Sequence, residues 1–176
     1  KILNAMNRKH NILEYHKIIK DLRIAKPEIK FSSDFIIGYP GETEDDFNQT
    51  LNLIDKVQFI NSYSFVYSAR PGTPASKLNN VDYKTAKKRL TKLQAILEKN
   101  NFKYKEGFLN KSTEVLFENR LDKQDKYFGR DKFLNSVIVQ SSKDLTGQIL
   151  DIKINNFNHS SLFGTILSNE KRNFAA

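Results

Sequence analysis

The sequence predicts an α/β region over residues 1–109 and an all-β region over residues 110–172, with residues 173–176 as a tail. Three observations predict this order. Helix-like and strand-like segments alternate through the first 76 residues, a long amphipathic helix follows, and five short strand-like runs come after it. Alternating helices and strands are typical of parallel βα units, whereas short strands separated by turn residues are typical of a small barrel.

The first residues predict two helices. Residues 2–6 form a short helical piece that ends in a polar, basic break at residues 7–10. Asn11 with Glu14 three residues later matches a helix capping box. Apolar residues at helical spacing then continue to Pro27. They are Ile12, Tyr15, Ile18, Ile19 and Leu22.

Residues 35–47 are the most informative segment, with the sequence FIIGYPGETEDDF. They predict the end of a strand over residues 31–37, a glycine- and proline-containing loop, and a helix that ends near Val57. Thr43 with Asp46 three residues later matches a capping box at the start of this helix. In α/β proteins, ligands bind in loops of this kind at the carboxyl ends of strands. Glycine also lets a ligand approach the backbone closely.

The charge of this loop restricts its ligand. The acidic residues 42–46 lie at the start of the helix, where they occupy the positive end of the helix dipole. A phosphate site needs that helix end free and is usually accompanied by a lysine. The loop therefore favours a neutral or cationic ligand, or no ligand. Asp34 and Glu42 could act as acid and base, although an acid at a helix start is more often a capping residue.

Residues 59–68 predict a second strand, because the aromatic residues Tyr63, Phe65 and Tyr67 alternate with serines. This strand ends in a loop that contains Arg70 and Pro71. An arginine held there could clamp a carboxylate bidentately; the alternative is an ordinary surface arginine. Two strands do not make a stable parallel sheet. Self-association or upstream strands would complete it, and the absence of an initiator methionine favours upstream strands.

Asp82 is expected to cap a long helix that ends near Phe108. Its apolar face consists of Tyr83, Ala86, Leu90, Leu93 and Leu97. Basic residues are predicted to lie on the opposite face. They are Lys84, Lys87, Lys88, Arg89, Lys92, Lys99, Lys103 and Lys105. This face is either a solvated helix surface or a stripe that contacts phosphates.

The C-terminal strands are predicted at residues 114–118, 127–130, 136–140, 148–154 and 162–167. Barrels of this size often bind oligonucleotides, but fold alone does not determine function. Gly129 and Gly164 lie inside two of these runs, where glycine indicates a bend or a close approach of backbones.

Composition narrows the class of protein further. The net charge of +9 raises the odds of a nucleic-acid partner. The chain contains no cysteine, so it has no structural disulfide and no cysteine-ligated cluster. No apolar run approaches the roughly 18 residues that a membrane span needs, so the expected location is cytoplasmic. The three histidines are not spaced as metal ligands, so a structural or surface role is expected for each.

Three motifs, in this order, resemble the radical-SAM methylthiotransferases. They are MNRKH at residues 6–10, SSDFIIGYPGET at residues 32–43 and YSFVYSARPGTPA at residues 63–75. Residues 110–172 resemble the TRAM domain that ends these enzymes. The resemblance implies the C-terminal part of a radical-SAM partial β/α barrel followed by a five-stranded TRAM barrel that holds RNA. The N-terminal domain, the early core strands and every cluster cysteine of the family are absent from this sequence.

The resemblance also implies site residues. Those implied for S-adenosylmethionine are Asp34, Gly38, Pro40, Gly41, Glu42 and Arg70. Those expected to contact RNA are Arg8, Lys9, Lys88, Arg89, Lys92 and Arg130. The implied RNA is a tRNA anticodon stem-loop. Iron–sulfur clusters belong to the full-length family and have no ligands here, and neither a catalytic residue nor a metal ligand is expected in this chain.

Three functions remain open. The Arg70-containing loop is similar to the tRNA-modifying branch, which adds a methylthio group to isopentenyladenosine next to the anticodon. The sister branch, which modifies an aspartate of a ribosomal protein, shares the Gly38–Glu42 loop. A non-catalytic RNA-binding remnant is the third. Because the chain lacks cysteine, it is expected to be inactive alone and to need the missing N-terminal part, as upstream sequence or as a separate chain.

Overall fold

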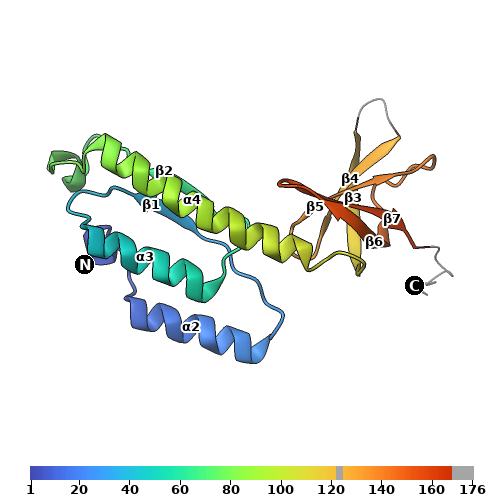
Figure 1. The fold of residues 1–176 in the computed structure, drawn as a ribbon, viewed down its shortest axis with the longest axis horizontal. Helices are drawn as coiled ribbons and strands as arrows, with labels where there is room; N and C mark the ends of the chain where they lie inside the picture. Colours follow the sequence, from blue (N-terminus) through green and yellow to red (C-terminus); the bar gives the residue numbers. More distant parts are fainter. Residues whose placement is uncertain (122–124, 168–176) are drawn as a thin grey trace. The chain divides into compact units, whose positions relative to one another are not determined.

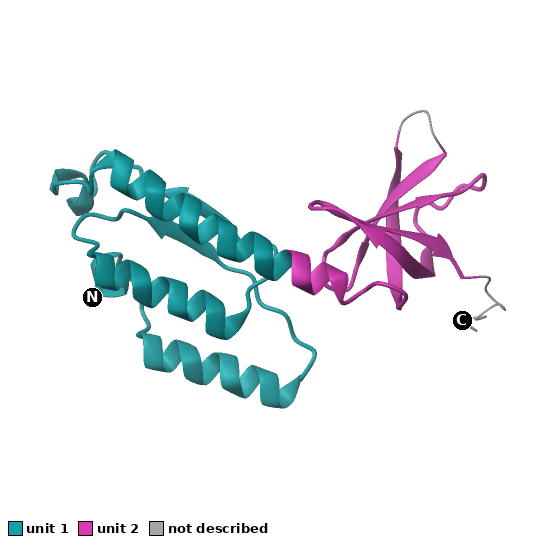
Figure 2. Ribbon diagram, in the orientation of Figure 1, with its two compact units in different colours: residues 1–101 teal, residues 102–176 magenta. Residues whose placement is uncertain are grey.

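The computed structural model describes residues 1–121 and 125–167. The chain divides into two compact units, an N-terminal unit of residues 1–101 and a C-terminal unit of residues 102–176 (Figure 2). The division falls inside the long helix. Among the residues that the structure describes, no helix is both long and apolar enough to cross a membrane. The tail expected at residues 173–176 lies outside the described residues.

The N-terminal unit has the predicted alternation of helices and strands (Figure 1). Its elements are α1 (Ile2–Ala5), α2 (Ile12–Ala25), β1 (Asp34–Ile37), α3 (Glu44–Val57), β2 (Tyr63–Val66), a 3₁₀ turn η1 (Pro74–Lys77) and α4 (Tyr83–Glu106). Strands β1 and β2 pair in parallel, with Asp34 opposite Tyr63 and Ile37 opposite Val66. Both strands are shorter than the predicted ranges 31–37 and 59–68, because the hydrogen-bonded pairing extends only over the residues where the two strands lie opposite each other.

The predicted helix caps are confirmed. The Asn11 side chain accepts hydrogen bonds from the backbone N–H groups of Leu13 and Glu14, and the Glu14 carboxylate accepts one from the Asn11 N–H. At α4, the Asp82 carboxylate accepts a hydrogen bond of 2.9 Å from the Thr85 N–H. Each cap satisfies backbone donors that a helix start leaves unpaired. The starting points of these helices are therefore determined by local sequence.

The core of the N-terminal unit lies between one face of the sheet and the helices. Phe35 and Ile37 of β1 pack with apolar side chains of α3 and α4. The residues of these helices in the core are Phe47, Leu51, Ile54, Val57, Leu93 and Leu97. The other face of the sheet is open, with the Tyr63 side chain 68% exposed and the Phe65 side chain 54% exposed. The alternation in β2 was predicted correctly, but its aromatic residues lie on the open face.

The apolar stripe of α2 is also less buried than its spacing suggests. Ile19 is buried in the core, whereas Ile12, Ile18 and Leu22 are exposed. A stripe at helical spacing is buried only where another element covers it. In this unit, the described contacts of the stripe with the core run through Ile19 and the partly buried Tyr15.

The C-terminal unit is a closed five-stranded barrel, as predicted, with strand order β3–β4–β5–β7–β6. The strands are β3 (Ser112–Leu121), β4 (Lys126–Asp131), β5 (Ser136–Gln140), β6 (Ile149–Phe157) and β7 (Ser161–Ile166). Strands β5 and β7 pair in parallel, and the other pairs are antiparallel. Because the sheet closes on itself, each of these five strands is paired on both sides. The predicted fold class is therefore confirmed in both parts.

Gly129 and Gly164 lie where two backbones approach closely, as predicted. A Cβ atom added at Gly129 would lie 2.5 Å from the Leu116 carbonyl oxygen, and one added at Gly164 would clash with the Lys153 carbonyl oxygen. Real Cβ atoms do not come this close to backbone atoms. Both glycines face neighbouring strands of the barrel, so they permit the barrel to close at this diameter.

The last turns of α4 contact the barrel within the C-terminal unit. The Asn135 amide donates a hydrogen bond of 3.0 Å to the Tyr104 hydroxyl and one of 2.8 Å to the Asp131 carboxylate. Burial raises the pKa of Tyr104 well above its usual range, and the Asp131 carboxylate adds to that rise. The Lys105 ammonium donates to the carbonyl oxygen of His159. Lys105 is buried, so its predicted place on the exposed basic face of the helix is wrong.

Candidate functional site

The loop of residues 38–43 connects the carboxyl end of β1 to the start of α3. Gly38 and Gly41 have φ angles of +76° and +81°. These angles lie in the left-handed region, which glycine adopts without steric cost. The backbone conformation of the loop therefore requires glycine at both positions, whether or not a ligand approaches it.

The two glycines differ in their surroundings. A Cβ atom at Gly38 would lie 2.7 Å from the Ala86 Cβ atom of α4, whereas a Cβ atom at Gly41 would meet nothing within 4 Å. Gly38 is thus packed against α4, and Gly41 faces open space. A ligand of this loop would approach at Gly41 rather than at Gly38.

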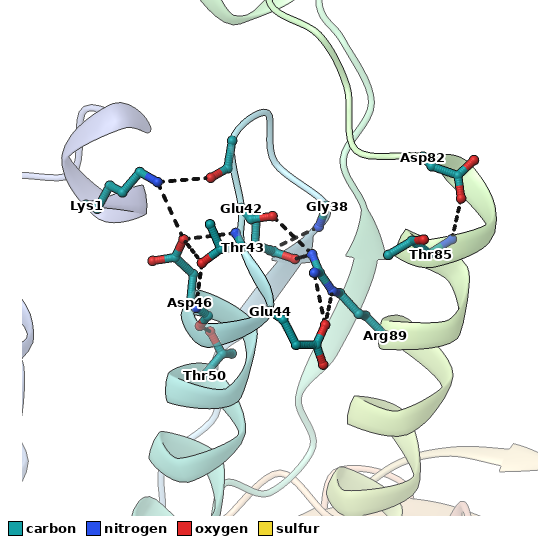
Figure 3. A network of polar contacts seen from close by, with 11 residues as sticks. Lys1, Gly38, Glu42, Thr43, Glu44, Asp46, Thr50, Asp82, Thr85 and Arg89 are labelled. Atoms are coloured by element: carbon teal, nitrogen blue, oxygen red, sulfur yellow. Dashed lines mark hydrogen bonds and ion pairs between the residues drawn. The ribbon is translucent and has the colours of Figure 1, made fainter.

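A buried ion pair joins the loop to α4 (Figure 3). The Glu42 carboxylate accepts a hydrogen bond of 2.8 Å from the Arg89 guanidinium and one of 3.1 Å from the Gly38 N–H. The same guanidinium donates to the Glu42 carbonyl oxygen at 3.2 Å. It also contacts the Glu44 carboxylate at 3.0 Å. The side chains of Glu42 and Arg89 are only 5% and 9% exposed, so this pair is largely shielded from water.

Burial raises the pKa of the Glu42 carboxyl above its ordinary value. The hydrogen bond from the Gly38 N–H and the charge of Arg89 act in the opposite direction and stabilise the ionised carboxylate. A carboxylate this buried would be strongly unfavourable without its partner. Glu42 therefore depends on Arg89 for its place in the fold.

The rest of the loop is held by local contacts. Thr43 and Asp46 form the predicted capping box, and these hydrogen bonds lower the pKa of Asp46. The Tyr39 hydroxyl donates a hydrogen bond of 2.8 Å to the carbonyl oxygen of Ala5 in α1. Pro40 is buried beside Tyr39. The loop is thus supported by α1, α3 and α4.

The other two residues expected at the cofactor lie outside this network. Asp34 is exposed at the amino end of β1, three residues or about 10 Å of extended strand before the loop. It shares the open face of the sheet with Tyr63. Arg70 is exposed on the loop after β2, and its carbonyl oxygen accepts hydrogen bonds from Thr73. Because the strands are parallel, Arg70 follows the same sheet edge as the Gly38 loop.

The residues expected to contact RNA are mostly exposed. Arg8, Lys9, Lys88 and Lys92 lie on the surface of the N-terminal unit. Arg130 is exposed on β4 of the barrel, where its guanidinium lies 5.2 Å from the ring centre of Phe128 and pairs with Glu118 at 3.2 Å.

Arg89 is the exception among these residues. The sequence placed it on the exposed basic face of α4, and the structure buries its side chain against the loop. Helical spacing could have revealed this position, because Arg89 comes three residues after the buried Ala86 and four before the buried Leu93. A basic residue within an apolar stripe predicts a buried acidic partner. The sequence does not say which acid that partner is.

Curated proteins similar to this chain are tRNA-2-methylthio-N(6)-dimethylallyladenosine synthases. The protein of Pelagibacter ubique (strain HTCC1062) is 46% identical over 99% of this chain. Those of Wolbachia pipientis wMel and Ruthia magnifica subsp. Calyptogena magnifica are each 42% identical, over 93% and 96% of it. No family model matches. The resemblance to the methylthiotransferases is confirmed, and the chain spans 38–39% of the length of these relatives.

The residues present can be compared with the two cofactors that the family implies. A Cβ atom at Gly41 would meet nothing within 4 Å, so the backbone there is open to the approach of a ligand such as S-adenosylmethionine. An iron–sulfur cluster does not fit this chain. The sequence contains no cysteine, and no group of three or more His, Asp or Glu side chains among the described residues could hold a metal ion.

Proposed function

We propose that this chain is part of a tRNA methylthiotransferase that uses S-adenosylmethionine to modify isopentenyladenosine next to the anticodon. The observation that carries the proposal is the 46% identity with a tRNA-2-methylthio-N(6)-dimethylallyladenosine synthase over 99% of the chain. The match covers both the loop and the barrel of this chain. The remaining length of the enzyme would supply the cluster and the rest of the β/α barrel.

In this proposal, residues 38–42 form one wall of the S-adenosylmethionine site. Gly41 lets the ligand approach the backbone, Pro40 stiffens the loop, and Arg70 follows the neighbouring strand at the same edge of the sheet. Asp34 would face the ligand side from the open face of β1. S-adenosylmethionine supplies the methyl group of the product. The residues of this chain bind and orient it.

The barrel and the exposed basic residues are proposed to hold the tRNA anticodon stem-loop. Arg8, Lys9, Lys88, Lys92 and Arg130 are the proposed contacts. Arg130 lies over the Phe128 ring, a pairing that can contact both a phosphate and a base. Exposed cations of this kind supply affinity that falls with salt. Arg89 is excluded from this set, because its guanidinium is engaged with Glu42 and Glu44.

The experiment that tests the proposal compares a strain that lacks this chain with its parent. Mass spectrometry of total tRNA nucleosides is expected to show isopentenyladenosine in place of its methylthio derivative. Normal tRNA together with loss of a methylthio group from a ribosomal-protein aspartate would favour the sister branch. If neither modification changes, the proposal fails, and binding of RNA without catalysis becomes the better description.

A second measurement tests the proposed RNA contacts on the purified chain. Binding of an anticodon stem-loop is measured at several salt concentrations for the wild type and for Arg130→Gln. Loss of one phosphate contact is expected to lower the salt slope by about 1. Lys143→Gln, at an exposed lysine outside the proposed set, is the matched control. Equal slopes for all three proteins would contradict the role of Arg130.

A further inference from the structure

Arg89 contacts the loop of residues 38–43 from a different element of the fold. It lies on α4, 47 residues from Glu42, and its side chain is buried between α4 and the start of α3. Its guanidinium contacts three oxygens of the loop and the helix start: the Glu42 carboxylate, the Glu42 carbonyl and the Glu44 carboxylate. The planar guanidinium lies 5.6 Å from the ring centre of Phe47 in the core. Arg89 is thus held on several sides.

Glu42 connects Arg89 to the loop through hydrogen bonds to both. One carboxylate oxygen faces Arg89, and the other accepts the N–H of Gly38, the first residue of the loop. The Glu42 N–H donates to the Tyr39 carbonyl at 2.9 Å, which closes the turn between them. The side chain of Glu42 therefore points toward α4, on the side where Gly38 is packed. The open side at Gly41 is left to a ligand.

We infer that Arg89 is a positioning residue, which fixes the conformation of the loop of residues 38–43 by holding the Glu42 carboxylate against α4. Glu42 then shapes the binding wall from behind and does not contact the ligand. The link to S-adenosylmethionine rests on the proposed function, whereas the link between Arg89 and the loop rests on the contacts alone. A lysine at this position would keep the charge but lose the planar array of donors.

Amide hydrogen exchange in the 176-residue chain tests the first link. We expect Arg89→Met to increase the exchange of the Gly38 and Glu42 amides at least 10-fold relative to the α3 amides, because the loop loses its anchor while the helix keeps its core packing. Arg89→Lys is expected to give an intermediate rate. Lys87→Met removes an exposed cation from the same helix, outside the proposed RNA contacts, and is expected to match the wild type.

Glu42→Gln supplies a second route that keeps the size of the side chain. It is expected to loosen the loop as Arg89→Met does, and the double variant should be no looser than Arg89→Met, since both changes break one contact. The inference is wrong if the loop amides of Arg89→Met exchange as in the wild type. It is equally wrong if loop and α3 amides accelerate by the same factor, because that pattern is a general loss of stability.

The second link is tested by calorimetric titration of S-adenosylmethionine into this chain assembled with the part of the enzyme that it does not contain. A loop that is ordered about one-tenth of the time weakens binding about 10-fold. Arg89→Met and Glu42→Gln are expected to raise the Kd by this factor, with Arg89→Lys between them and the wild type. An unchanged Kd with a loosened loop would refute the role in ligand positioning. Failure of the wild-type assembly to bind would refute the proposed function, while the exchange pattern would still decide the role of Arg89.

Discussion

The two units of this protein reach stability in different ways. In the C-terminal unit each of the five strands that the structure describes has a neighbour on both sides, and the core residues are almost fully buried. In the N-terminal unit two short strands pair only with each other, and Tyr63 and Phe65 remain exposed on the face away from the helices. A closed barrel satisfies its own backbone, whereas a two-stranded parallel sheet gains little alone. The N-terminal unit is therefore the one whose loop of residues 38–43 depends on specific contacts such as that of Arg89.

The largest expected difference between the units is in independent folding. Residues 102–176 produced alone should unfold cooperatively in urea, with amide shifts close to those of the full chain. Residues 1–101 alone should show weak cooperativity, because their sheet leaves large apolar side chains exposed. Far-UV circular dichroism and ¹H–¹⁵N spectra measure both. A cooperative, well-dispersed N-terminal fragment would remove the contrast.

Within the barrel, Gly129→Ala is expected to be strongly destabilising. The added methyl group meets the Leu116 carbonyl and the Val115 side chain, and such overpacking costs about 3 kcal/mol. Gly147→Ala is the control within the same unit. It has a φ of +75° and no atom within 4 Å, so it should lose only about 1 kcal/mol. Urea denaturation measures both values, and equal losses would mean that the strands separate easily at Gly129.

A matched pair of glycines tests the packing of the loop in the N-terminal unit. Gly38→Ala and Gly41→Ala both incur the strain of a left-handed backbone, but only Gly38→Ala also presses on Ala86 of α4. Gly38→Ala should therefore be less stable than Gly41→Ala by about 1–2 kcal/mol. Thermal unfolding of the two variants gives the difference. Equal stabilities would show that α4 yields to the methyl group and that the loop is only loosely supported.

The smallest expected effect concerns Tyr104 in the C-terminal unit. Because its folded pKa lies above the unfolded value of 10.0, its stabilisation is fully present below pH 10 and is lost as the pH rises above it. Tyr104→Phe should cost about 1 kcal/mol at pH 7 through the lost hydrogen bond with Asn135. The gap between wild type and variant should then narrow above pH 10. Urea unfolding from pH 7 to pH 11 measures it, and parallel pH profiles would contradict the expectation.

Local features of the fold were predictable from the sequence. The caps at Asn11, Thr43 and Asp82 place the starts of three helices, because a cap acts within a single turn. The strands after residue 110 and the two barrel glycines were also predicted. A half-buried strand alternates apolar and polar residues, and a close approach of two backbones requires glycine. The glycine loop at residues 38–41 was predicted on the same grounds, and its two glycines have positive φ angles; that it binds a ligand stays a prediction.

The features that were predicted wrongly depend on distant contacts. The sequence placed Arg89 and Lys105 on a solvated face, whereas the structure buries both against partners far along the chain, Glu42 and His159. Alternation in β2 distinguished two faces but did not say which face the helices would cover. The spacing of apolar residues shows the periodicity of a helix or strand, whereas the face that is buried depends on the elements packed against it.

By itself, the sequence determined the order of the elements, the glycine loop and the resemblance to the methylthiotransferases. Each of these depends on residues close together in the chain or on a motif read as a whole. Only the tertiary structure decided that Glu42 turns away from the open side of the loop and pairs with Arg89. The physical reason is burial: a carboxylate removed from water must find a cation, and the fold determines which cation is within reach.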